Sequence, residues 1–256
     1  MKLSGYQLKE SNRCTLSKIN FRYSIIYLRH NDGGIVSKGE EISADALIIT
    51  QDTLAAIDVL FDSPLREPWA DKMRAEVKPM FDTFICLDIK EDLSDIHECV
   101  TSTSDTLVFC AGEEINSIEI NDYATYEGYA PEGCTAVTSA FIGDSYAWWK
   151  ERKIDGTYEV EKQKLAENFI DVLAKKYPQT AGKVEVWDVV KPLTYERYLH
   201  SYKGSWMSIM GKGTKMRSYP SKPESISNLY FAGQRLMVPG GLPVAAETGR
   251  KAVQYL

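Results

Sequence analysis

The residues best suited to chemistry form a glycine-rich loop between a predicted strand and a predicted helix. Residues 228–233 are a short apolar run that ends in glycine. Residues 244–256 have the pattern of a helix, with Pro243 in its first turn and Gly241 or Leu242 near its cap. A helix N-terminus carries about half a positive charge and unpaired N–H groups, and glycine lets a ligand approach them closely. The pattern predicts a site for an anion or an electron-rich ring edge, although a tight strand-to-helix connection explains the glycines equally well.

Residue spacing indicates no other chemistry. The 3 histidines lie far apart, and none has a second metal ligand at a suitable spacing, so no metal site is predicted. The 5 cysteines occur singly, which is typical of reduced thiols rather than of a disulfide framework. No G-x-G-x-x-G occurs anywhere, so the usual dinucleotide fingerprint is missing. No side chain stands out as a general acid or base, and no catalytic residue is assigned.

The composition is that of an ordinary globular protein. The chain has 256 residues, of which 44% are hydrophobic and 26% charged, which excludes disorder and coiled coil. Its net charge of -6 argues against nonspecific binding to nucleic acid, which depends on Lys and Arg. No apolar run is long enough to span a membrane, and the first residues lack the apolar core of a signal peptide. A cytoplasmic location is expected.

The elements that would position the loop follow from hydrophobic patterning. Residues 19–28 and 34–36 predict a hairpin around an Asn-Asp-Gly-Gly turn, and 44–50 predict a strand buried on both faces. A short helix is predicted at 53–61 with Thr53 as N-cap. Strand-like runs at 80–89, 105–110, 117–120 and 135–142 predict an antiparallel sheet, and 183–190 predict one more strand. Helices are predicted around 145–149 and over 159–176.

Four segments resemble a known family of flavoproteins. Residues 228–234, 239–243 and 247–252 (NLYFAGQ, PGGLP and ETGRKA) resemble the C-terminal FAD-binding motif of the phytoene desaturase and carotenoid isomerase group, within the wider amine-oxidase-like proteins. Residues 191–198 (KPLTYERY), with Gly204 and Ser205 after them, are similar to that group's "TPLTFERY…GS" segment. Residues 130–133 resemble its "APEG", and 44–48 resemble the "ADxVI" strand that re-enters the cofactor domain.

The resemblance implies a fold of class α/β plus α+β. It implies a partial, Rossmann-like FAD-binding domain without its N-terminal βαβ unit, formed by residues 1–56 and 226–256. A substrate-binding domain at 57–225, built on a mixed or antiparallel sheet flanked by helices, would be inserted between them. Family members are about twice as long and begin with the G-x-G-x-x-G unit. The chain is therefore expected to be a C-terminal half that binds FAD weakly or not at all by itself.

The resemblance also implies site residues. The expected cofactor-binding residues are Gly233, Gln234, Arg235, Pro239, Gly240, Gly241, Leu242 and Pro243. Thr194, Tyr195, Arg197 and Tyr198 are expected to line the substrate tunnel or flavin pocket, with an aromatic connection between domains as the alternative. Trp148 and Trp149 suit an apolar cavity, and packing explains them as well.

The resemblance suggests an FAD-dependent oxidoreductase that acts on an apolar, isoprenoid-like substrate. The alternative is a non-catalytic substrate-binding or docking module that pairs with a separate N-terminal FAD-binding polypeptide or self-associates. A basic loop, formed by Lys212, Lys215, Arg217 and Lys222, suits peripheral contact with anionic lipid, although such runs are usually just solvated. Nucleic acid is not an expected partner.

Overall fold

The structure is a computed structural model that describes residues 46–256 except 62, 97 and 210–214. The chain forms two compact units, Met1–Pro79 with Tyr198–Leu256 (the first unit) and Met80–Arg197 (the second unit). The boundaries that the sequence predicted for the cofactor and substrate domains, after residues 56 and 225, stay a prediction. The predicted hairpin at 19–36 lies outside the described residues.

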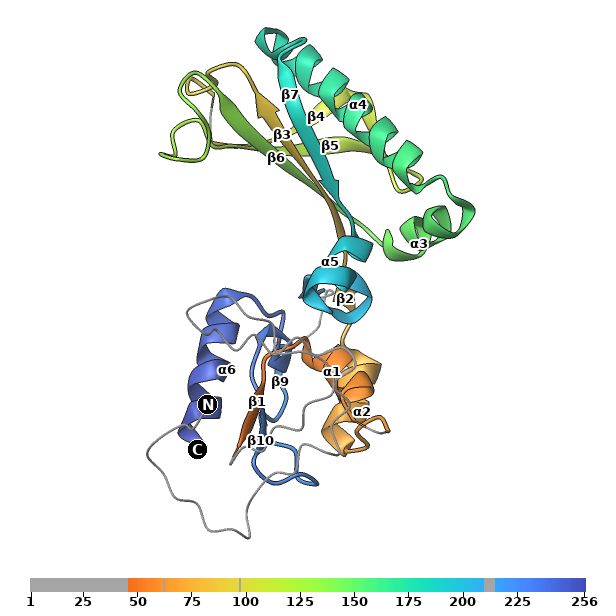
Figure 1. Ribbon diagram of the computed structural model, residues 1–256, viewed down its shortest axis with the longest axis vertical. Helices are drawn as coiled ribbons and strands as arrows, with labels where there is room; N and C mark the ends of the chain where they lie inside the picture. The colour runs from red at the N-terminus through yellow and green to blue at the C-terminus, as the bar shows by residue number, and fades with distance from the viewer. Residues whose placement is uncertain (1–45, 62, 97, 210–214) are drawn as a thin grey trace, which may run out of the picture. The chain divides into compact units, whose positions relative to one another are not determined.

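The first unit is built on two parallel strands, β1 (Leu47–Ile49) and β10 (Leu229–Phe231). Alternate residues of a strand point to opposite faces. Leu47, Ile49, Leu229 and Phe231 pack with α1 (Thr53–Val59) and α2 (Pro68–Glu76), while Ile48 and Tyr230 pack toward Ala252 of α6 (Leu242–Gln254). The helices therefore cover both faces of the strand pair (Figure 1).

Local sequence accounts for the ends of these helices. Asp52, rather than the predicted Thr53, is the N-cap of α1, because its carboxylate accepts a 3.0 Å hydrogen bond from Leu54 N–H. Helix α2 was not predicted, although Pro68 stands at its first position, where proline is favoured. Helix α6 begins after Gly241 with Pro243 in its first turn, which confirms the prediction.

Short elements complete the first unit. They are the 3-10 turns η5 (Tyr202–Gly204) and η6 (Gln234–Leu236) and the strands β8 (Met207–Ser208), β9 (Arg217–Ser218) and β11 (Met237–Val238). Strands β9 and β11 pair in antiparallel fashion. Strand β2 (Pro79–Met80) lies where the chain passes from one unit to the other.

The second unit is an antiparallel sheet flanked by helices, which agrees with the sheet of mixed or antiparallel strands that the sequence predicted. Its strand order is β4-β5-β6-β3-β7. The strands are β3 (Asp82–Ile89), β4 (Cys99–Cys110), β5 (Glu113–Asp122), β6 (Thr135–Ile142) and β7 (Val184–Val190). The helices are α3 (Tyr146–Asp155), α4 (Tyr158–Lys176) and α5 (Pro192–Leu199), with a 3-10 turn η4 (Pro178–Thr180).

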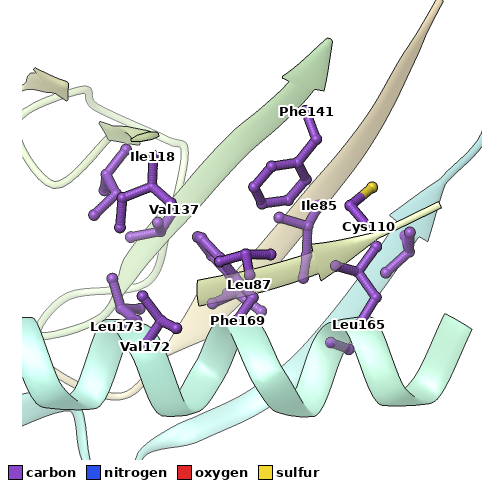
Figure 2. Packing of buried hydrophobic residues seen from close by; sticks show 14 of the residues in the cluster. Ile85, Leu87, Cys110, Ile118, Val137, Phe141, Leu165, Phe169, Val172 and Leu173 are labelled. Atoms are coloured by element: carbon purple, nitrogen blue, oxygen red, sulfur yellow. The ribbon is translucent and has the colours of Figure 1, made fainter. Parts of the chain in front are cut away.

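The core of the second unit lies between the sheet and α4. Leu165, Phe169 and Leu173, at helical spacing, pack against residues such as Ile85 and Val137 on the facing strands (Figure 2). Trp149 is fully buried in the same cluster, where its indole N–H donates to Thr83 Oγ1 over 2.9 Å. Packing, not a cavity wall, is therefore the role of Trp149.

None of the helices in the described ranges is both long enough and apolar enough to cross a membrane.

Candidate functional site

The predicted loop lies between β10 and α6, and its backbone has the conformation that glycine permits. Gly233, Gly240 and Gly241 have φ values of 144°, 110° and 94°, a region that residues with a Cβ rarely adopt. A Cβ added to Gly240 would come within 3.0 Å of the Gln234 carbonyl oxygen. At Gly241 the nearest atom would be Pro243 Cδ, 3.8 Å away. Glycine is therefore required by packing at Gly240 and by conformation at Gly241, which leaves the backbone bare at the start of α6.

The N-terminus of α6 is open. Its N-cap, Gly241, makes no side-chain cap, and the first turn contains no acidic residue. The N–H of Ala245 donates to Gly241 C=O over 3.1 Å, whereas the N–H groups of Leu242 and Val244 precede the first intrahelical bond. The Leu242 side chain is 87% exposed, so it does not cover these groups. The helix end offers two N–H donors and a positive partial charge to a ligand.

Gln234 fixes the loop in front of α6. Its side-chain oxygen accepts a 3.1 Å hydrogen bond from Gly241 N–H, and its side-chain nitrogen donates to Trp206 C=O over 2.5 Å. The same residue therefore binds the N-cap position of α6 and the segment before β8. This arrangement makes Gln234 a support of the loop.

Arg235 holds the loop from behind. It is 2% exposed, and its Nε donates to Asp52 Oδ2 over 2.9 Å. Its Nη1 donates to Met207 C=O (2.5 Å) and to Ser208 Oγ (2.8 Å), and its Nη2 donates to the backbone and the hydroxyl of Ser205. Every nitrogen of the guanidinium is thus engaged within the protein, which points to a structural role for a residue that the sequence predicted to bind cofactor.

Asp52 connects this arginine to the carboxyl end of β1. One carboxylate oxygen caps α1, and the other accepts from Arg235 and, over 3.3 Å, from Tyr202 N–H. Sequence reasoning did not assign a role to Asp52. Its position, directly before a predicted helix and after a predicted strand, was the available signal.

Thr248 joins the other side of the loop. Its hydroxyl oxygen accepts from Gly233 N–H over 2.9 Å, and the same hydroxyl lies 2.8 Å from Val244 C=O within α6. Because Thr248 is 3% exposed, this contact fixes the end of β10 against the second turn of the helix. Pro239 precedes the paired glycines, and Pro243 is exposed in the first turn of α6.

The predicted substrate residues lie in or at the end of α5. Thr194 Oγ1 accepts a 3.4 Å hydrogen bond from the N–H of Lys191, the residue before α5. Tyr195 is half-buried, and its hydroxyl donates to Asp82 Oδ2 over 3.5 Å. Arg197 ends the second unit and Tyr198, which is 61% exposed, begins the first. The structure brings the predicted cofactor residues together in the first unit, while Thr194, Tyr195 and Arg197 belong to the second.

Burial perturbs the groups around Tyr195. Asp82 is 5% exposed, and this desolvation raises the pKa of its carboxyl to about 6 despite the hydrogen bond from Tyr195. Burial, together with the nearby Asp82 carboxylate, raises the pKa of the Tyr195 phenol well above its ordinary value. Both shifts disfavour ionisation, relative to the same groups in water.

The loop fits one end of a flavin. The pyrimidine edge of the isoalloxazine gains negative charge on reduction, so it requires N–H donors, positive potential and close approach, with no acidic side chain nearby. The open N-terminus of α6 and the bare backbone at Gly240 and Gly241 meet these requirements. The residues that would hold this edge are Gly240, Gly241, Leu242 and Pro243, through their backbone. A pyrophosphate cradle of the G-x-G-x-x-G type is missing from the sequence, so the fit covers part of the cofactor.

Comparison with known families decides the class. The family model for flavin-containing amine oxidoreductases matches residues 13–256. This chain belongs to the flavin-containing amine oxidoreductase family. The family is FAD-dependent, and the predicted wider amine-oxidase-like group is confirmed. No curated protein matches the chain.

Solved structures show the same fold. Cyclohexylamine oxidase from Brevibacterium oxydans is similar with a TM-score of 0.54 and 16% identity, over 86% of this chain and 44% of that one. An oxidoreductase from Methanosarcina mazei is similar with a TM-score of 0.50 and 17% identity, over 87% of this chain and 46% of that one. The mixed α/β fold, with its five-stranded antiparallel sheet and flanking helices, thus matches part of an amine oxidase fold. The chain spans less than half the length of these structures.

Proposed function

We propose that this chain supplies the C-terminal part of an FAD-dependent oxidoreductase of the phytoene desaturase type. In this proposal, the backbone of Gly240–Pro243 and the N-terminus of α6 bind and polarise the pyrimidine end of the flavin. The main observation in support of the proposal is the N-terminus of α6, which has no side-chain cap and no acidic residue in its first turn. It follows two glycines with positive φ values, and the chain belongs to a flavin-dependent family. When bound, the flavin supplies the electron-accepting chemistry. The residues of this chain bind it, orient it and tune its charge.

We propose an apolar substrate because of the side chains on one face of the sheet in the second unit. On the sheet face opposite α4, Phe84 lies between Ala140 on β6 and Val190 on β7, and all three are half-buried. Ile142 and Val186, at opposite ends of the same face, are 60% and 57% exposed, and the strand register also places Thr138, Asp88 and Asp188 on this face. The apolar part of the face around Phe84 suits a hydrocarbon ligand such as an isoprenoid. Thr194, Tyr195, Arg197 and Tyr198 are proposed to contribute at the α5 end. No residue is assigned as a catalytic acid or base.

A charge introduced at the start of α6 tests the cofactor proposal. The full chain is titrated with FAD, oxidised and dithionite-reduced, and binding is followed by flavin absorbance and fluorescence. Leu242→Glu adds a negative charge at an exposed first-turn position, so it stabilises the helix by up to about 1 kcal/mol while repelling the reduced ring. We expect weak binding by the parent chain, and a further loss in the variant that is larger for reduced than for oxidised FAD.

Val253→Glu is the matched control. Val253 is also exposed on α6, at 60%, but lies in its last turn. This variant should bind both forms of FAD as the parent does. Equal effects of Leu242→Glu and Val253→Glu would contradict the assignment of the flavin edge to the helix N-terminus. Tight, stoichiometric FAD binding by the parent would contradict the expectation that the chain lacks the main pyrophosphate cradle.

A second function, docking onto a separate FAD-binding polypeptide, is favoured by two observations. In the described residues, β1 and β10 form a parallel sheet of two strands, whereas sheets usually have more strands. Leu242, Val253 and Leu256 are exposed apolar residues of α6 and the chain end. We propose that a polypeptide carrying a G-x-G-x-x-G unit, or a second copy of this chain, covers this surface. Size-exclusion chromatography with light scattering tests self-association, and a strictly monomeric chain over a wide concentration range would contradict the second-copy version.

A further inference from the structure

The loop between β5 and β6 carries an exposed aromatic cluster formed by Tyr123, Tyr126 and Tyr129, here named the tyrosine cluster. The rings of Tyr123 and Tyr129 stack with their centroids 5.1 Å apart and their planes at 4°. The Tyr126 ring is tilted against both, with centroid distances of 5.8 and 5.6 Å. Tyr126 and Tyr129 are nevertheless 46% and 61% exposed. Exposed aromatic side chains that gather in one place are typical of interaction surfaces, and neither the proposed flavin site nor the proposed substrate face uses these rings.

Hydrogen bonds hold the tyrosine cluster in place. Tyr126 N–H donates to Tyr123 C=O over 3.1 Å, and Tyr129 N–H donates to Tyr126 C=O over 3.3 Å, so successive turns present a ring at every third residue. The Tyr126 hydroxyl donates to Glu98 Oε2 over 3.1 Å, and the Tyr123 hydroxyl lies 3.4 Å from Thr138 Oγ1 on β6. Because the rings are fixed in advance, a partner that binds them costs little conformational entropy.

The surface around the tyrosine cluster is acidic. Glu98 joins the segment before β4 to this loop, because its C=O accepts from Asp122 N–H over 2.8 Å and its carboxylate accepts from the Thr125 hydroxyl over 3.0 Å. The two joined segments, 91–98 and 121–134, contain no Lys or Arg. Their acidic residues are Glu91, Asp92, Asp95, Glu98, Asp122, Glu127 and Glu132. Of these, Glu91 alone has an ion pair among the described residues, with Lys183.

The carboxylates are close enough to act on one another. Burial raises the pKa of the Asp122 carboxyl against the hydrogen bond from Ala124 N–H, and the charges of Asp92, Asp95 and Glu98 raise it further. A cation at this surface would therefore meet several uncompensated negative charges. The described residues include no group of carboxylates arranged to hold a metal ion, so the surface suits an extended organic cation.

We propose that the tyrosine cluster and the carboxylates around it bind an arginine-rich segment of a partner protein. A guanidinium stacks on the exposed face of a ring, and a neighbouring guanidinium pairs with a carboxylate through two parallel hydrogen bonds. Glu127 lies between Tyr126 and Tyr129 in the chain, Glu132 follows in the same loop, and both are exposed. The loop thus offers rings and carboxylates in alternation, which matches a segment with several arginines.

Peptide binding to the full chain without flavin tests the proposal, so the result is independent of the proposed oxidoreductase function. Octa-arginine, octa-lysine and octa-glutamate are titrated into the chain by calorimetry at about 0.15 M salt. We expect saturable binding of octa-arginine, weaker binding of octa-lysine, because an ammonium lacks the planar face that stacks on a ring, and no binding of octa-glutamate. Absence of octa-arginine binding, or equal affinities for octa-arginine and octa-lysine, would overturn the proposal.

Ring variants test the aromatic part of the surface. Tyr126→Ser combined with Tyr129→Ser should weaken octa-arginine binding at least about fourfold, because each exposed cation–π contact contributes about two- to fivefold. Tyr126→Phe combined with Tyr129→Phe keeps both rings and should bind as the parent does. Phe109→Ser is the control, since Phe109 is 56% exposed near the other end of β4, and circular dichroism checks that each variant is folded. A loss for Phe109→Ser, or for the phenylalanine pair, as large as that for the serine pair would overturn the proposal.

Charge variants test the acidic part. Glu127→Gln combined with Glu132→Gln should weaken octa-arginine binding several-fold. Glu113→Gln combined with Glu114→Gln removes the same charge from the start of β5, roughly 30 Å from the loop that follows its end, and should have little effect at this salt concentration. Equal losses for the two pairs would overturn the proposal, because the peptide would then respond to the net charge of the chain rather than to this surface.

Discussion

Arg235 should be the residue on which the geometry of the loop depends most. Arg235→Met removes a buried guanidinium that binds Asp52, Ser205, Met207 and Ser208. It leaves the Asp52 carboxylate, whose side chain is 8% exposed, without its cationic partner. Removing one member of a buried ion pair typically costs about 3–5 kcal/mol, because the remaining charge stays desolvated. That is a large part of the roughly 5–15 kcal/mol by which a domain is stable, so the first unit should be close to unfolding.

A matched arginine gives the control. Arg217 of β9 lies in the same unit and pairs with Glu76, but the two side chains are 36% and 29% exposed. Exposed pairs contribute about 0–1 kcal/mol, so Arg217→Met should be mild. Urea unfolding, followed by Trp fluorescence and far-UV circular dichroism, measures both variants against the parent. Asp52→Asn combined with Arg235→Met should recover part of the loss, because the uncompensated charge is then absent. Equal losses below about 1 kcal/mol for the two arginine variants would refute the argument that Arg235 holds the loop.

Three further predictions concern single residues. Gly240→Ala should destabilise the first unit by about 1–3 kcal/mol in urea unfolding, because Gly240 has a φ of 110° and a Cβ there would contact Gln234. Gly249 lies in open space within α6, so Gly249→Ala should stabilise the first unit by up to about 1 kcal/mol. Burial raises the pKa of Asp82 to about 6, so the carboxyl binds its proton more tightly in the folded second unit than in the unfolded chain. The stability of the second unit should therefore fall as pH rises from about 4 to 6. Asp82→Asn should abolish that pH dependence in denaturant titrations. Burial opposes ionisation of Glu67, but hydrogen bonds from Ser225, Glu224 and Trp69 outweigh this effect and lower the pKa of Glu67. The first unit should lose this stabilisation as pH falls below the ordinary carboxylate range. Glu67→Gln should therefore make the stability of the first unit depend less on pH in that acidic range.

The elements with strong local signals could be predicted from the sequence. The apolar run that became β10, the glycines after it and the first turn of α6 are consecutive in the chain, so their patterns locate the loop. The alternating runs of the middle segment likewise gave the antiparallel sheet, with β4 and β5 longer than predicted. Helix α2 was missed because it is short, with 9 residues of which only Ala70 and Met73 are buried, although Pro68 marks its start.

The supports of the loop could not be predicted, because they join segments far apart in the sequence. Arg235 and Asp52 are separated by 183 positions, and Arg235 and Ser205 by 30. Nothing in the local pattern distinguishes a buried, fully bonded arginine from one that faces a ligand. The resemblance did place Gly204 and Ser205 among the matching segments, and the structure puts Ser205 against the Arg235 guanidinium. The predicted cofactor-binding set therefore mixes residues that face the open loop with residues that hold it in place.

This division of roles bears on whether the loop is a binding site or only a connection. Gln234 and Arg235 are adjacent, and they bind consecutive carbonyl groups, those of Trp206 and Met207. Gln234 also binds the N–H of Gly241, so the start of α6 is fixed from outside its own first turn. If the loop only connected β10 to α6, a side chain that caps the helix would be expected, since capping stabilises helices by about 0.5–2 kcal/mol. Here the backbone is held rigidly while the N–H groups at the start of α6 lack a side-chain cap. Fixed but uncapped donors are what a ligand site requires, and this is the reason to favour flavin binding over a simple turn.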